Sequence, residues 1–175
     1  MNTNTTRSNI NTPSMEIERK YLVKKPSILQ LSAHAELSIC GIIQFYLLSK
    51  EGAERRIRAR WTGTHTSYFL TEKREITPLC REETEREISF DEYVNYHNER
   101  DFSLSSIVKQ RICFDYKGQL FELDIFSFSD KFALMEIELK SENDTVTLPD
   151  FIEVIKEVTN DPHYRNRNLA KTQTL

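Results

Sequence analysis

The sequence has few cysteines, no long hydrophobic run and no excess of positive charge, and each absence excludes a class of protein. Its three cysteines, Cys40, Cys80 and Cys113, show no Cys-x-x-Cys spacing and have no histidine at zinc-ligand distance. We expect free thiols, as is typical of the reducing cytoplasm. No segment approaches the roughly 20 apolar residues of a membrane span, and the N-terminal residues lack the apolar core of a signal peptide. We therefore expect no membrane partner.

Charge is abundant but nearly balanced. Of the 175 residues 29% are charged, yet the formal net charge is only −3. A general nucleic-acid binder is strongly basic, so we expect no nucleic-acid partner. The apolar content of 38% suffices for one core of ordinary size. We predict a single domain over residues 15–175, preceded by a disordered, Asn/Thr/Ser-rich tail at residues 1–14.

Most of the chain has the alternating pattern of β-strands. In Met15–Val23 the alternation places two acids and a base on one face and apolar side chains on the other. Similar strands are expected through residue 140, interrupted by a helix that begins at Ser89, where Glu92 completes a capping box. Further helices are expected in 26–38, from Thr147 and from Asp161.

The charged faces of these strands carry pairs of like sign. The acids are Glu16, Glu18, Glu83, Glu85, Glu122, Asp124, Glu136 and Glu138. The bases are Lys20, Arg58, Arg60, Lys73, Lys109 and Arg111. Arg56 has the same parity as Arg58 and is expected either among these bases or at the rim.

Two architectures are compatible with this pattern. In the first, an ordinary sheet exposes its charged face to water. That account does not explain the like-sign pairs, because neighbouring like charges repel and a mixed surface is more soluble. In the second, which we predict, the fold is β-rich α+β, a closed antiparallel barrel with a charged lumen and a few helices packed outside. Its carboxylates favour Mg²⁺, Mn²⁺ or Ca²⁺, and its bases favour phosphate oxygens, so a divalent metal with a polyphosphate chain satisfies both.

The ordered charge pairs resemble the CYTH superfamily, also called triphosphate tunnel metalloenzymes. The hallmark Glu-x-Glu-x-Lys is present at 16–20, the other pairs follow in order, and the segment 148–170 is similar to the tail of short bacterial members. The resemblance covers residues 15–170. It implies an eight-stranded antiparallel tunnel that cleaves triphosphates with Mg²⁺ or Mn²⁺ at two sites.

The resemblance also implies roles for individual residues. The catalytic metal would be held by Glu16, Glu18, Glu136 and Glu138. A second metal, or the attacking water, would be held by Glu83, Glu85, Glu122 and Asp124. The triphosphate would be bound by Lys20, Arg58, Arg60, Lys73, Lys109 and Arg111. Lys20, Lys109 and Tyr46 would be catalytic, and a Tyr46/Lys109 pair resembles one that bears on substrate preference in short bacterial members.

The function predicted by this resemblance is metal-dependent hydrolysis of the terminal phosphate of inorganic tripolyphosphate, with nucleoside triphosphates as weaker or alternative substrates. The partner is then a small-molecule triphosphate, with a homodimer left open. Three alternatives remain at this point: a class IV adenylate cyclase, a thiamine triphosphatase, and a non-catalytic polyphosphate-binding module.

Overall fold

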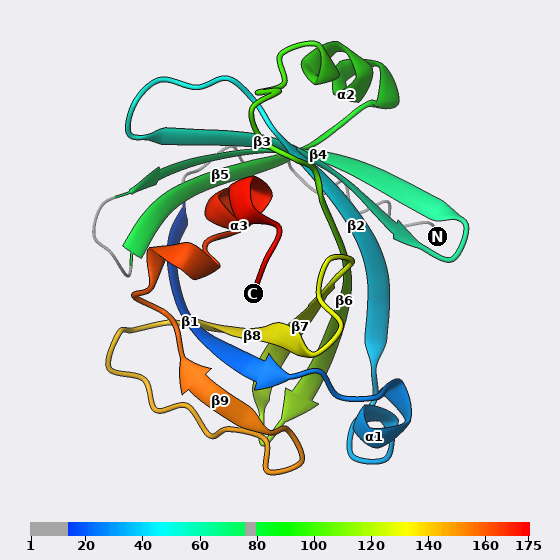
Figure 1. Cartoon of the computed structure of the whole chain (residues 1–175), viewed down its shortest axis with the longest axis vertical. Coiled ribbons are helices and arrows are strands. Elements are labelled where there is room, and N and C mark those ends of the chain that lie inside the picture. The colour runs from blue at the N-terminus through cyan, green and yellow to red at the C-terminus, as the bar shows by residue number, and fades with distance from the viewer. Residues whose placement is uncertain (1–13, 76–79) are drawn as a thin grey trace, which may run out of the picture.

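A computed structural model describes residues 14–75 and 80–175, without the side chains at 14–16, 75, 80 and 81. The predicted polar tail lies outside the described residues apart from Ser14, where the first strand begins. Within the described residues, nine strands form one antiparallel sheet (Figure 1). They are β1 (Ser14–Lys24), β2 (Ser38–Tyr46), β3 (Ala53–Thr62), β4 (His65–Glu75), β5 (Cys80–Ile88), β6 (Ile107–Tyr116), β7 (Gln119–Phe126), β8 (Phe132–Leu139) and β9 (Val154–Glu157). The helices are α1 (Ile28–Ser32), α2 (Phe90–His97), the 3-10 turn η1 (Pro162–Tyr164) and α3 (Asn166–Thr172).

The strands pair in the order β5-β4-β3-β2-β6-β7-β8-β1-β9. Consecutive strands joined by tight turns account for much of this order. Between β6 and β7, Lys117 and Gly118 both have positive φ angles, of 54° and 76°, as a two-residue type I′ hairpin requires. This turn sets the register that brings Arg111 opposite Asp124.

The prediction of a closed eight-stranded barrel is wrong. The sheet has a ninth strand in its described part, and it is not closed by hydrogen bonds along its length. β1 meets β5 only through its first four residues, Ser14–Ile17, and farther along it pairs with β9 instead, at Tyr21–Val23. In the described residues, Thr84–Ile88 of β5 pair with β4 alone. Within the described residues, the result is a strongly curled sheet in which β1 and β5 are joined along only part of their length.

The outer face of the sheet is apolar, as the alternation predicts. One buried cluster covers the outer side of β1, β6, β7 and β8, where Leu31 of α1 and Ile152 pack. A second cluster covers β3, β4 and β5, where Tyr93 and Tyr96 of α2 pack. These two clusters stabilise the curled sheet by burying apolar side chains on its outer face.

α3 corrects the prediction that the helices pack only outside. Leu169 and Ala170 of this helix are buried against Leu22, Leu134 and Phe126, which have the same strand parity as the charged residues and so lie on the inner face. Figure 1 shows α3, in red, surrounded by the strands. The inner face is therefore charged in one part and filled by apolar contacts with the C-terminal segment in another.

The helix predicted from Thr147 is also wrong. Residues 148 and 149 are irregular, a turn and a bend follow at 150–152, and the chain continues as β9 along the edge of β1. The apolar residues that suggested a helix pack individually: Phe151 contacts the rings of His34, Phe114 and Tyr116 on the outer face. The free backbone groups of the β1 edge offer the following residues a strand partner, which overrides a weak helical pattern.

The capping box that predicts α2 is present. The Ser89 hydroxyl accepts a hydrogen bond from the Glu92 backbone N–H, and the Glu92 carboxylate accepts one from the Ser89 N–H.

Replacement of Ser89 by alanine is expected to lower the free energy of unfolding by about 1 kcal/mol, because the Glu92 N–H loses its acceptor. Urea unfolding followed by circular dichroism measures this. Ser32→Ala is the control, since the Ser32 hydroxyl only donates to the Leu29 carbonyl within α1. Equal effects of the two changes would contradict the capping role.

The prediction of free thiols is confirmed for two of the cysteines. Cys40 and Cys113 are both unbridged, and burial raises the pKa of the Cys113 thiol to about 11. The side chain of Cys80 lies outside the described residues. No helix in the described part of the chain has the length and apolarity needed to cross a membrane.

Candidate active site

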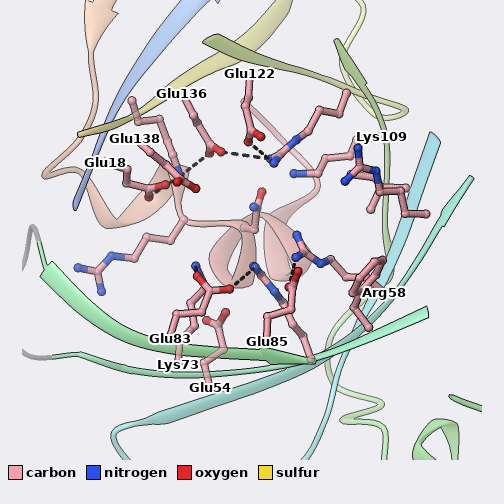
Figure 2. A pocket seen from close by; sticks show the side chains of 18 residues that line it. Glu18, Glu54, Arg58, Lys73, Glu83, Glu85, Lys109, Glu122, Glu136 and Glu138 are labelled. Carbon is pink, nitrogen blue, oxygen red and sulfur yellow. Dashed lines mark hydrogen bonds and ion pairs between the residues drawn. The ribbon is translucent and has the colours of Figure 1, made fainter. Parts of the chain in front are cut away.

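The curled sheet encloses a cavity of about 440 Å³ on its charged face (Figure 2). Among the described residues, those lining it comprise seven acids, eight bases and three others. They are Glu18, Lys20, Ile42, Glu54, Arg56, Arg58, Arg60, Phe69, Lys73, Glu83, Glu85, Lys109, Arg111, Glu122, Glu136, Glu138, Arg165 and Asn166. The solvated-sheet alternative is therefore excluded, because the charged side chains converge on one cavity.

On one wall, β1 and β8 bring acids and a base together through their register. Lys20 lies opposite Glu136, and Glu18 lies opposite Glu138. The Lys20 Nζ is 2.8 Å from Glu136 Oε1 and 3.4 Å from Glu18 Oε1. Burial alone raises the pKa of Glu136, but Lys20 and Arg111 lower it well below its usual range. Glu136 is thus a carboxylate held ionised by two cations.

On the same wall, Arg111 contacts three acids. Its guanidinium donates to both oxygens of Asp124 at 2.7 Å, to Glu136 at 3.2 Å and to Glu122. The Lys109 ammonium also donates to Asp124. Burial, reinforced by the neighbouring Arg111 charge, lowers the pKa of Lys109 to about 8.

The opposite wall comes from β3, β4 and β5. Lys73 pairs with Glu83 at 2.8 Å, and Arg58 pairs with Glu85. Glu85 also accepts a hydrogen bond of 2.7 Å from the Thr71 hydroxyl. Burial raises the pKa of Glu85, but the Arg58 charge and the Thr71 hydrogen bond more than offset this and lower it. Figure 2 shows Glu83 and Glu85 across the cavity from Glu122 and Glu136.

Twelve of the predicted site residues line this cavity, and two described ones, Asp124 and Tyr46, do not. The Glu16 side chain lies outside the described residues. Asp124 is fully buried beneath Lys109 and Arg111. We infer from this location that Asp124 holds the two cations in place and does not contact a metal ion.

Tyr46 also lies away from the cavity. It is 2% exposed and packs in the apolar cluster around α3, where its hydroxyl accepts a hydrogen bond of 2.7 Å from Gln44. Burial raises its pKa far above the ordinary value. The catalytic role of Tyr46 stays a prediction. From this location, Tyr46 can influence the cavity only through the residues that it contacts.

Several lining residues were missed by sequence reasoning or left open. Arg56, left open, lines the cavity and lies 3.7 Å from Glu83. Glu54 has the same strand parity as Arg56, and that signal was sufficient to find it. Arg165 and Asn166 come from the segment that enters α3, and no periodicity marks them. Only the return of the C-terminal segment to the inner face reveals them.

The carboxylates of the cavity can hold a metal ion only in part. In the part of the chain that the structure describes, no three Asp, Glu, His or Cys side chains are arranged to hold an ion by themselves. Mg²⁺, however, is commonly bound through one or two carboxylates together with water and substrate phosphates. Glu18 and Glu138, paired across β1 and β8 and both lining the cavity, are such a pair. The donor set therefore fits a divalent ion that is completed by a phosphate ligand.

Comparison with known proteins gives consistent matches. Residues 14–171 match the CYTH domain. An inorganic triphosphatase from Acetivibrio thermocellus is 31% identical over 162 residues, which cover 89% of this chain and 93% of that protein. The crystal structure of the inorganic triphosphatase NE1496 is similar with a TM-score of 0.58 and 30% identity, over 89% of this chain and 94% of the other. The PH1819 protein of Pyrococcus horikoshii OT3, at 24% identity and a TM-score of 0.56 over 73% and 80% of the chains, shares the fold.

Proposed function

This chain belongs to the CYTH domain family, and we propose that it is a divalent-metal-dependent triphosphatase. Its substrates would be inorganic tripolyphosphate and, as alternative substrates, nucleoside triphosphates, each hydrolysed at the terminal phosphate. One observation carries the proposal: a single cavity lined by eight bases and seven acids of the described chain. The similarity to proteins named inorganic triphosphatase supports the same assignment.

The bases of the cavity would bind the triphosphate from two sides. Lys20, Lys109 and Arg111 lie on one wall, and Arg58, Arg60 and Lys73 on the other. Phosphoryl transfer needs positioning and charge stabilisation more than covalent chemistry, and bases on both walls can contact successive phosphates. Arg guanidinium groups can contact two phosphate oxygens at once.

The carboxylates would hold the metal. Glu18, Glu136 and Glu138 are the proposed ligands of the described chain, together with Glu16. Glu83, Glu85 and Glu122 would hold a second ion or orient the attacking water. A bound Mg²⁺ or Mn²⁺ supplies positive charge that offsets the negative charge developing on the transferred phosphoryl group.

The ion pairs of the cavity can exchange partners when a triphosphate and its metal ion bind. Lys20 contacts Glu18 and Glu136, and Lys73 contacts Glu83. When a triphosphate binds together with its cation, the phosphates can take over the bases while the carboxylates retain a positive partner. Neither set of charges is then left buried without compensation.

Metal removal tests the proposal. Phosphate release from tripolyphosphate is expected only with Mg²⁺ or Mn²⁺, to stop on addition of EDTA, and to return when the metal is restored in excess. The absence of metal-dependent phosphate release from tripolyphosphate and from ATP would refute a triphosphatase. Formation of cyclic AMP and pyrophosphate from ATP would assign a cyclase instead.

A further inference from the structure

A second cavity, of about 530 Å³, adjoins the charged cavity described above, here called the central cavity, at one end of β7 and β8. Glu122 and Glu138 line both cavities, so the two spaces meet at these side chains. Figure 2 shows both carboxylates on the same wall of the central cavity. The second cavity, here called the side cavity, is lined by Gly118, Gln119, Leu120, Glu122, Ile137, Glu138, Leu139, Lys140, Asp144 and Thr145.

The side cavity exists because β7 and β8 separate. Their ladder runs from Asp124↔Leu134 to Glu122↔Glu136, and no further pair follows in the described chain. The ladder of β7 with β6 nevertheless continues to Gln119, and that of β8 with β1 continues to Leu139. The edges of residues 119–121 and 137–139 that face each other therefore lack a strand partner, and their backbone groups border the opening.

The far rim of the side cavity is held in place by hydrogen bonds. The Gln119 amide donates to the Thr145 carbonyl at 2.9 Å and accepts from the Thr147 N–H at 2.7 Å. The Asp144 carboxylate accepts from the backbone N–H groups of Lys140 and Ser141, both at 3.0 Å. The segment after β8 is thereby tied to the start of β7, which keeps the opening from collapsing.

The chemistry of the side cavity differs from that of the central cavity. Leu120 is 58% exposed, and the partly buried Leu139 adds apolar surface, whereas the Ile137 side chain is buried in the outer apolar cluster. Three carboxylates line the space against one base, Lys140. This balance disfavours a further length of phosphate chain, because like charges repel. A neutral organic group with an apolar ring face and polar edges matches the leucines and the strand edges instead.

We propose that the side cavity binds the nucleoside part of a nucleoside triphosphate whose phosphates lie in the central cavity. This inference rests on the proposed triphosphatase function and adds the position of the organic group. The ring would pack on Leu120 and Leu139, and its polar edge would meet the exposed backbone groups of β7 and β8. Inorganic tripolyphosphate, which has no organic group, would leave the side cavity unused.

Leu120→Asp tests the proposal, because it adds a charge and removes apolar surface without touching the central bases. The ratio of kcat/KM for ATP to kcat/KM for tripolyphosphate is expected to fall about tenfold, mainly through the KM for ATP. Leu48→Asp is the matched control, since Leu48 is 63% exposed and lines neither cavity. This control is expected to leave the ratio unchanged.

Three other results would be decisive. An unchanged ratio in Leu120→Asp, or the same fall in Leu48→Asp, would overturn the nucleoside site. Hydrolysis of tripolyphosphate without binding or hydrolysis of ATP would also overturn it, while the proposed function stood. If neither compound is hydrolysed, the proposed function fails, and calorimetry with ATP and tripolyphosphate then tests the nucleoside site. Weaker binding of ATP, but not of tripolyphosphate, by Leu120→Asp would support the nucleoside site. Equal binding of ATP by Leu120→Asp and the unchanged protein would overturn it.

Discussion

Asp124→Ala is expected to destabilise the fold by about 3–5 kcal/mol, as is typical when one partner of a buried ion pair is removed. Asp124 is fully buried, and it is the shared acceptor of Lys109 and Arg111, whose side chains are 1% and 14% exposed. Without it, two cations remain in the protein interior with fewer partners. Urea unfolding measured by fluorescence and circular dichroism gives the change in the free energy of unfolding.

Glu122→Gln is the matched control for this loss of stability. Glu122 also pairs with Arg111, but its side chain is 27% exposed, so water can replace the lost partner. We expect a clearly smaller loss for Glu122→Gln. Similar losses for the two variants would show that Asp124 is not the main support of the buried cations, and would restore it as a candidate metal ligand.

Glu18→Ala is expected to lower metal-dependent turnover of tripolyphosphate on the order of 100-fold or more, while the protein stays folded. Glu18 lines the cavity beside Lys20 and opposite Glu138. Its removal takes a proposed metal ligand from a crowded acidic wall, yet Lys20 keeps its contact of 2.8 Å with Glu136. Phosphate release, the Mn²⁺ concentration at half-maximal rate and the melting temperature are the measurements.

Glu153→Ala serves as the control for this variant. Glu153 also pairs with a lysine, Lys24, but both side chains are more than half exposed and lie away from the cavity. This change is expected to leave turnover intact. A Glu18→Ala protein with normal turnover and unchanged metal dependence would remove Glu18 from the proposed metal site.

The charged face of the sheet could be predicted because a strand has a period of two. Residues such as Arg58 and Arg60, or Glu136 and Glu138, must share a face once the segment is extended. The capping box at Ser89 and Glu92 was equally local, and α2 begins there. The apolar outer wall followed from the same alternation.

The features that depend on distant segments could not be predicted in this way. The cavity has a contribution from Arg165 and Asn166 because the C-terminal segment returns to the inner face, where Leu169 is buried. Asp124 and Glu122 have the same spacing in the sequence as the other acid pairs. Only the packing of Lys109 and Arg111 over Asp124 makes the surroundings of Asp124 differ from those of Glu122.

By itself, then, the sequence determined which side chains share a strand face, because alternation is a local property of the backbone. The tertiary structure alone decided that the acids and bases converge on one cavity, which carboxylates reach it and where β7 and β8 separate. These features depend on contacts between distant segments: β1 pairs with β5 at one end and with β9 farther along, and α3 occupies part of the interior.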